Sequence, residues 1–322
     1  MLDLLKGFIA GSWGGTFAWV IPNCILPAMF WFFVYSPMRE PPLSRLIWSL
    51  QGGQTTALLI TIGVVAGLLA SAISAPLYRF LEGYAWPRSL RNWRIKAHQA
   101  RKSALEERLE KEPDGIEYGL LFEKLARYPT NVAQIAPTRL GNAIRSLETY
   151  GKTRFNLDSQ SVWSELFTLV PDALRKEVDQ ARAVVDFFVA LLYALAIWGL
   201  ASLLAGIDEP DKPAAFVFAS ICLIGCWGAY ESAIQSCAYW RVTVQALVNV
   251  GRAELAKAVG LVIPPTLEEE QKMWGLVVSY VSFADPTTGQ QIDKYRAGAA
   301  KKSTASNDLV SRLRRAIEAF TS

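Results

Sequence analysis

Three long stretches without a charged side chain, and a fourth with a single one, constrain the fold more than any other feature of this sequence. They are residues 7–38, 46–78 and 187–207, and residues 213–240, whose one charged side chain is Glu231. Each is at least as long as the roughly 20 apolar residues that a helix needs to cross a bilayer. Because the runs are continuously apolar rather than alternating, they indicate helices and not the strands of a barrel. We therefore expect an all-α fold with four transmembrane helices, at about 16–36, 55–78, 187–207 and 214–236.

Charge, cysteine content and motifs narrow the class further. The chain has 33 Lys and Arg and 29 Asp and Glu in 322 residues, so it needs sizeable water-facing regions beside the spans. Four Cys in a chain of this length exclude a secreted disulfide scaffold, and a single His without a His/Cys cluster argues against a zinc or haem site. The sequence contains no phosphate-binding loop, dinucleotide fingerprint, HExxH or GxSxG motif. We expect no cofactor, no metal site, no catalytic residue and no enzymatic activity.

Cations next to the spans orient the chain. Residues 79–102 carry seven Lys and Arg against one acid, Glu82, and such an excess is typical of the cytoplasmic side. The loop 208–213 has three acids and one Lys, which indicates the outside. These counts predict two hairpins with both termini cytoplasmic, and the first span, which no cleavage pattern follows, stays as an anchor. Contact with anionic lipid headgroups explains this cluster of cations more simply than nucleic-acid binding does, so we do not expect nucleic acid as a partner. The cations expected to contact anionic lipid headgroups are Arg79, Arg88, Arg91, Arg94 and Lys96.

The water-facing parts of the chain are predicted to be helical. Residues 79–186 and the region after the fourth span together predict a cytoplasmic helical domain. Residues 89–112 predict a solvated helix, Thr138 predicts the cap of a helix from Arg139 to about Thr149, and Asp158 predicts a further helix cap. The chain from Pro171 runs without a breaker into the third span, and none follows the fourth span before Gly260, so we expect both of these helices to continue beyond their apolar runs. The expected domains are a first transmembrane hairpin at 1–78, a cytoplasmic helical region at 79–186, a second hairpin at 187–236, a cytoplasmic helical extension at 237–296, and a flexible linker with a basic amphipathic tail helix at 297–322.

Two spans have a face of small residues at four-residue spacing. Small residues let helix backbones approach closely in lipid. We interpret both faces as packing seams within one subunit, and a homo-oligomer interface is the alternative. The residues are Gly63, Gly67, Ser71 and Ala75 in the second span and Gly225, Ala229 and Ala233 in the fourth.

Glu231 is the candidate intramembrane polar site. Charges within a bilayer are costly, so such a residue is a functional candidate. It lies ten residues before Arg241, about 15 Å along a helix at about 1.5 Å per residue, and therefore in the cytoplasmic half of its span. We consider a proton or cation site, and favour a structural pair with a cytoplasmic arginine such as Arg182. His98, on the charged helix, is interpreted as a surface residue rather than a catalytic one.

Several segments carry a family resemblance. They are residues 137–142 (Pro-Thr-Arg-Leu-Gly-Asn), Trp163, residues 169–171 (Leu-Val-Pro) and residues 264–274, which begin Pro-Pro-Thr-Leu-Glu-Glu-Glu and end in Trp. Together they resemble a group of uncharacterised bacterial multi-pass membrane proteins over roughly residues 130–280. The resemblance implies a location in the bacterial inner (plasma) membrane and brings no established activity.

Three functions from different classes fit these features. We favour a non-enzymatic polytopic membrane protein whose cytosolic helical domain binds a protein partner or senses a state, because the domain is large and catalytic motifs are absent. The first alternative is a homo-oligomeric ion channel or pore, with Glu231 near its pathway and a first span kinked at Pro22 and Pro27. The third is a membrane enzyme that modifies lipid.

Overall fold

The described part of the chain is helical. This computed structural model describes residues 14–35, 52–111, 115–208, 213–283 and 286–296, and within these ranges it has helices and no strand. The chain divides into two compact units. The first comprises residues 1–146 and 176–243, and the second comprises residues 147–175 and 244–322.

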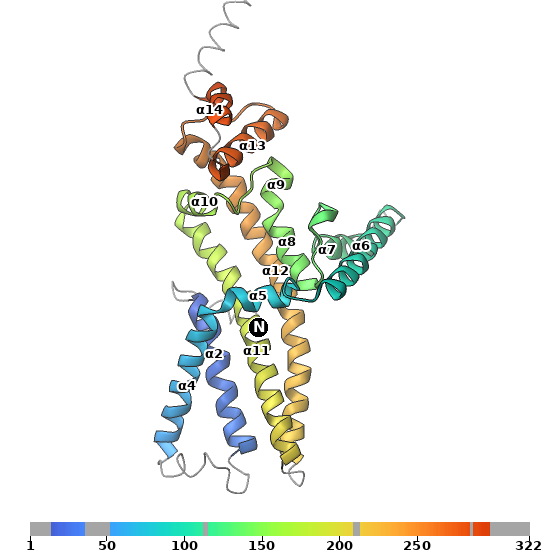
Figure 1. The fold of residues 1–322 in the computed structure, drawn as a ribbon, viewed down its shortest axis with the longest axis vertical. Helices are drawn as coiled ribbons and strands as arrows, with labels where there is room; N and C mark the ends of the chain where they lie inside the picture. Colours follow the sequence, from blue (N-terminus) through green and yellow to red (C-terminus); the bar gives the residue numbers. More distant parts are fainter. Residues whose placement is uncertain (1–13, 36–51, 112–114, 209–212, 284–285, 297–322) are drawn as a thin grey trace, which may run out of the picture. The chain divides into compact units, whose positions relative to one another are not determined.

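Four helices are long and apolar enough to span a membrane, as expected of an integral membrane protein (Figure 1). Two of them continue far past the thickness of a bilayer core, since 37 and 46 residues at about 1.5 Å each exceed about 30 Å. The predicted continuity of these two helices beyond their apolar runs agrees with their bounds. The helices are α2 (Gly14–Phe30), extended by the π-helical turn η1 (Trp31–Tyr35), α4 (Gly52–Ala72), α11 (Asp172–Asp208) and α12 (Pro213–Ala258).

The second span ends earlier than the sequence predicted. Its helix stops at Ala72 instead of residue 78, and a separate helix, α5 (Ser74–Glu82), begins two residues later. Pro76 explains the break, because its ring would clash with the carbonyl of Ala72 in a continuous helix. In the first turn of a new helix the missing N–H of Pro76 costs nothing, and α5 turns away from the direction of α4 (Figure 1).

Glycines set the spacing between α2 and α4. A Cβ atom at Gly63 would lie 2.5 Å from the backbone oxygen of Asn23, and one at Gly67 would lie 2.5 Å from Cα of Val20. Only glycine permits such an approach. Ser71 is half-buried, whereas Ala75 is exposed and belongs to α5, so the four-residue series does not continue along one helix.

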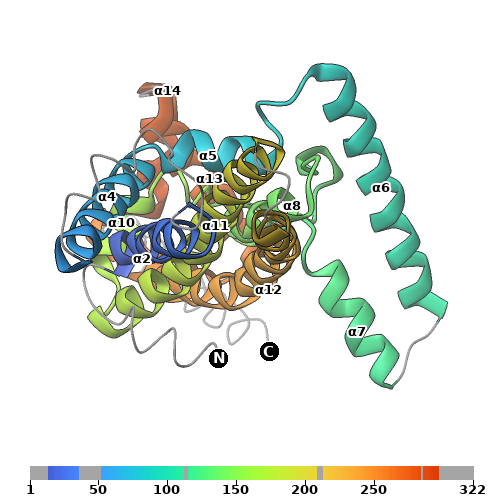
Figure 2. The same cartoon turned by 90° about the horizontal axis from the view of Figure 1, so that it is seen from below.

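The small residues of α12 pack against α11. A Cβ atom at Gly225 would lie 3.0 Å from Cδ1 of Leu195. Ala229 and Ala233 are buried at 4% and 1% exposure, in apolar clusters that also contain residues of α11 and α2. Both views show α2 between α4 and α11 (Figures 1 and 2). Within the first unit, each small face therefore has a neighbouring helix of the same chain.

The first unit also contains helices outside the spans. After α5, helices α6 (Arg88–Lys111) and α7 (Ile116–Leu125) form an arm that stands away from the spans in both views (Figures 1 and 2). A 3₁₀ turn, η2 (Val132–Gln134), and helix α8 (Arg139–Glu148) follow. The predicted helices at 89–112 and 139–149 correspond to α6 and α8.

The second unit contains a largely buried ion pair. Oε1 of Glu270 accepts hydrogen bonds of 3.1 Å from both Arg252 and Trp274, and Arg252 lies over the ring of Phe155 at 4.3 Å. Asp158 does not cap a helix: its carboxylate accepts from the backbone N–H of Gln160, and α10 begins five residues later. The unit contains α9 (Tyr150–Phe155), α10 (Trp163–Leu169), α13 (Leu267–Phe283), α14 (Pro286–Ile292) and η3 (Asp293–Tyr295). The expected linker and tail helix at 297–322 lie outside the described residues.

Candidate functional site

The Pro-Thr-Arg-Leu-Gly-Asn segment forms a rigid turn at the start of α8. The hydroxyl of Thr138 accepts a 2.9 Å hydrogen bond from the backbone N–H of Gly141, which caps the helix as the sequence predicts. Asn142 is 1% exposed, and its amide bonds the backbone of Ala136 as both donor and acceptor, at 2.9 Å each. It also donates to the carbonyl of Thr138 at 2.8 Å. One buried amide therefore fixes both sides of the turn.

Close packing against the end of α5 holds this turn in place. Gly83 has φ +87°, in the left-handed region, and a Cβ atom there would lie 2.3 Å from Cγ of Pro137. A Cβ atom at Gly141 would lie 2.9 Å from the backbone oxygen of Glu82. Both sites require glycine, one for its backbone conformation and both for space. The turn is thereby locked against the C-terminal end of α5.

The turn presents Arg139 to Glu231, the one acid in the apolar run of α12. The guanidinium of Arg139 binds the carboxylate of Glu231 through two nitrogens, with the Nη2 to Oε2 distance at 2.9 Å. The phenolic oxygen of Tyr230, next to Glu231, accepts from the backbone N–H of Leu140 at 3.4 Å. Arg182, the partner named from the sequence, instead lies 3.8 Å from Asp186, one turn further along its own helix. The favoured type of partner for Glu231 is thus present, but the arginine comes from α8.

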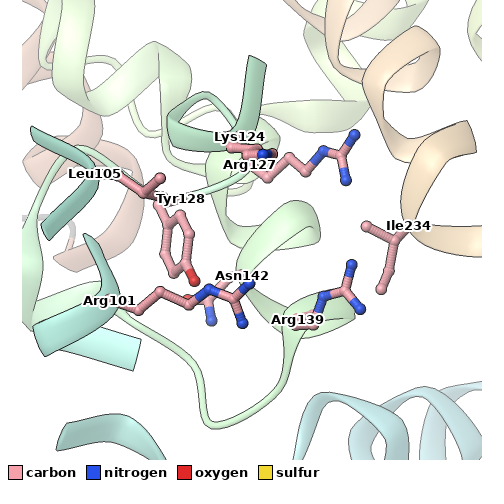
Figure 3. Close-up of a pocket in the computed structure, with 8 residues that line it drawn as sticks. All are labelled: Arg101, Leu105, Lys124, Arg127, Tyr128, Arg139, Asn142 and Ile234. Atoms are coloured by element: carbon pink, nitrogen blue, oxygen red, sulfur yellow. The ribbon is translucent and has the colours of Figure 1, made fainter. Parts of the chain in front are cut away.

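A cationic hollow opens beside this ion pair (Figure 3). It has a volume of about 60 Å³ and is lined by α6, the end of α7 with the residues after it, α8 and α12. Figure 3 shows Arg101 and Tyr128 on one side and Arg139 with Ile234 on the other. We call it the cationic pocket, and its lining residues are Arg101, Leu105, Lys124, Arg127, Tyr128, Arg139, Asn142 and Ile234.

The charges of the cationic pocket do not balance. Four of its lining residues are cations and none is an acid. Arg139 is paired with Glu231, and Arg127 is paired with Glu123 at 2.5 Å. Arg101 and Lys124 have no hydrogen-bond or ion-pair partner among the residues that the structure describes. Two positive charges are left without a countercharge.

A buried histidine supports the wall of the pocket. His98 is 4% exposed, contrary to the prediction of a surface residue, and its Nδ1 lies 3.1 Å from the hydroxyl of Tyr128. Burial and the neighbouring Arg94, Arg101 and Arg139 lower the pKa of His98 from 6.5 to about 4. Its imidazole is therefore neutral at pH 7. Burial also raises the pKa of the Tyr128 hydroxyl, so this group stays protonated.

Lys102, one turn after His98, joins α6 to the chain after α7. Its ammonium is buried, donates to the carbonyl of Thr130 at 2.8 Å, and lies 3.4 Å from Glu106. His98 and Lys102 are the buried residues of α6. The sequence missed both, because a charge-rich helix shows no apolar face that would mark its buried side.

The cations predicted to contact lipid are spread over two helices. Arg79 lies exposed in α5, while Arg88 and Lys96 are exposed in α6. Arg91 and Arg94 are half-buried, and Nε of Arg94 donates to the carbonyl of Pro137 at 3.4 Å. Arg94 thus helps to hold the turn, while contact of this group with lipid stays a prediction.

The sequence did not identify the pocket residues from α6 and α7. Arg101 was seen only as part of a cationic stretch, and Lys124 and Arg127 were not singled out. Their three-residue spacing just before Pro129 is the one local sign that they share a face. No family model, curated protein or solved structure matches the chain. Functional inference therefore depends on the geometry of this site.

Proposed function

We propose that the protein is a non-enzymatic, membrane-anchored module whose α6–α8 region senses a state or binds a partner at the cytoplasmic face of a bacterial inner membrane. The single observation that carries this proposal is the Arg139–Glu231 ion pair. One of its residues belongs to a helix outside the spans and the other to an apolar run of a membrane helix. The same Arg139 lines the cationic pocket with residues of the arm. A ligand in the pocket would thus lie next to Arg139 and could change its ion pair with Glu231 of α12.

The cytoplasmic orientation is part of this proposal. It is supported by the excess of Lys and Arg in residues 79–102, which run from the end of α5 into the arm. The bacterial location follows only from the family resemblance described above. Exposed apolar side chains on α7, including Ile116 at 84% and Phe122 at 56%, give the arm a surface that a protein partner could cover.

The alternatives have less support. The channel hypothesis placed Glu231 near the pathway, beside a kinked first span and a small-faced second span, and in the structure this acid forms an ion pair with Arg139. A lipid-modifying enzyme requires a nucleophile and a base within reach of each other. The cationic pocket has neither a carboxylate nor a cysteine or serine in its lining. We therefore carry the sensing and binding module forward.

The proposal can be tested by hydrogen–deuterium exchange on the full-length protein in dodecyl maltoside. Glu231→Gln removes the countercharge of Arg139, and we expect backbone exchange in α7 and in residues 126–138 to rise about tenfold. A tenfold change corresponds to about 1.4 kcal/mol of lost local stability. The measurement shows whether loss of the charge on Glu231 lowers the local stability of the arm.

Glu107→Gln is the matched control. It removes an acid of similar pairing, because Glu107 forms an ion pair with Lys111, but both residues are exposed on α6. Exchange in α7 should be unchanged in this variant. If Glu231→Gln alters only α12 and leaves the arm as in the wild type, the coupling does not exist and the proposed function is wrong.

A further inference from the structure

Two unpaired cations face a hollow that is otherwise rigidly built. Arg101 and Lys124 come from different helices and both line the cationic pocket. Like charges brought together destabilise a fold unless a countercharge is present. Within the described residues no acid fills that role for either cation. The missing countercharge is the first observation that points to an anionic ligand.

The walls of the pocket offer further hydrogen-bond donors. Arg127 and Arg139 line the pocket as well, each with its guanidinium paired to an acid outside the lining. The hydroxyl of Tyr128 can donate into the pocket when neutral His98 carries its proton on Nδ1, because Nδ1 then donates to the phenolic oxygen. Guanidinium and hydroxyl donors around one space match the acceptor oxygens of an oxyanion.

The size of the pocket limits the ligand. A buried water molecule needs roughly 10–15 Å³ of cavity volume. The pocket, at about 60 Å³, therefore has room for about four waters or one tetrahedral oxyanion. The apolar members Leu105 and Ile234 complete the lining. Arg101 and Lys124 are exposed, so the pocket is open to solvent on their side.

We propose that the cationic pocket binds a phosphate group, with Arg101 and Lys124 as its principal charge partners. This inference rests on the proposed function, because it names the ligand class of the same site. The shared chemistry is a phosphate monoester or free phosphate, which carries up to two negative charges and matches the two unpaired cations. The phosphate can belong to an anionic lipid headgroup or to a soluble molecule, and the experiment below separates these sources.

The binding test uses full-length protein in dodecyl maltoside, a detergent without phosphate, at 150 mM chloride. The first arm measures binding of radiolabelled inorganic phosphate by equilibrium dialysis. The second arm counts adducts of dioleoyl phosphatidic acid by native mass spectrometry, with dioleoylglycerol as the phosphate-free lipid. We expect one saturable site in at least one arm and no retention of dioleoylglycerol.

Variants locate the site. Arg101→Gln/Lys124→Gln should weaken binding at least tenfold, and Lys124→Gln alone should weaken it severalfold, since charge-assisted hydrogen bonds are lost. Both residues are exposed, so we expect the fold to be retained, and the midpoint of thermal unfolding checks this. Lys111→Gln is the control, because Lys111 is an exposed cation of the same arm outside the pocket. It should bind as tightly as the wild type.

Each outcome has a defined meaning. Binding of phosphate alone identifies a soluble ligand, binding of phosphatidic acid alone identifies a headgroup, and both results support the inference. No binding in either arm, or equal binding by the double variant, overturns it. If hydrogen–deuterium exchange shows that Glu231 and the arm are coupled but phosphate does not bind, the proposed function is supported and the ligand class is wrong. If phosphate binds but the arm is not coupled to Glu231, the phosphate site is supported and the proposed function is wrong.

Discussion

Arg139 and Glu231 lie 92 residues apart in the sequence and form a two-point ion pair in the fold. Arg139 occupies the first position of α8, whereas Glu231 belongs to the apolar run of α12. The side chain of Glu231 is 21% exposed, so the pair is partly shielded from solvent. It is the contact through which a helix outside the spans reaches the one acid within that run.

The first prediction concerns the energy of this pair. Arg139→Ala and Glu231→Ala should each lower the free energy of unfolding, and a double-mutant cycle should give a coupling of about 1–2 kcal/mol. This value lies between those of exposed and fully buried pairs, because both side chains are partly exposed. Denaturant unfolding of the purified protein in detergent measures it.

The pair Asp172–Arg175 provides the comparison for this cycle. Its acid is 76% exposed, against 21% for Glu231, and the pair lies within one helical turn, so its coupling should be about 0.5 kcal/mol or less. Equal coupling energies for the two pairs would show that Arg139 and Glu231 are no more than a surface pair.

The second prediction concerns the pH dependence of stability. The folded protein holds His98 neutral with a pKa of about 4, while the unfolded chain protonates it near 6.5. Between these values the unfolded state binds more protons, so stability should fall as pH is lowered from about 6.5 to about 4. The loss attributable to His98 is up to about 3 kcal/mol. From about one pH unit above 6.5 this residue should contribute no pH dependence, because neither state then protonates it.

His98→Gln isolates this effect, because the chain has a single histidine. The glutamine side chain can still bond to the Tyr128 hydroxyl but does not titrate. The midpoint of thermal unfolding should therefore decline less steeply from pH 6.5 to 4.5 in the variant than in the wild type. Parallel curves for the two proteins would mean that His98 is solvated, as the sequence alone suggested.

The third prediction concerns the seam between α2 and α4. Gly67→Ala should destabilise the protein by about 1–3 kcal/mol, because the added Cβ atom would meet the backbone of Val20 at 2.5 Å. Gly53→Ala, in the same helix, has no heavy atom within 4 Å of its Cβ position and should change stability by less than about 0.5 kcal/mol. Thermal unfolding in detergent compares them, and similar midpoints would contradict the close packing.

The fourth prediction concerns the turn that holds Arg139. Gly83→Ala should destabilise the protein by about 2–3 kcal/mol, because it adds strain at a positive φ to a clash with Pro137. Gly119→Ala, in the open middle of α7, should instead stabilise the fold by about 0.5–1 kcal/mol through helix propensity. Effects of the same sign at both positions would contradict this account.

The sequence by itself determined the classes and bounds of most helices. The length of the apolar runs predicts the four candidate spans, because any continuous apolar run of about 20 residues is long enough to cross a bilayer, whatever tertiary contacts it makes. The absence of a breaker before Gly260 likewise predicted that the fourth helix continues past its apolar part. The end of the second span was predicted wrongly because the uncharged run continues to residue 78, whereas Pro76 ends the helix at Ala72. The effect of proline is local, so it can be predicted from the sequence.

Only the tertiary structure decided which residues meet. The partner of Glu231, the burial of His98 and the convergence of Arg101 with Lys124 depend on contacts between helices that are distant in sequence. The spacing of Lys and Arg in the sequence does not tell whether they line a pocket or face bulk solvent, because their long side chains occur in both environments. The Pro-Thr-Arg-Leu-Gly-Asn turn is an intermediate case. Its helix cap is readable from Thr138, but its position against Gly83 is set by packing.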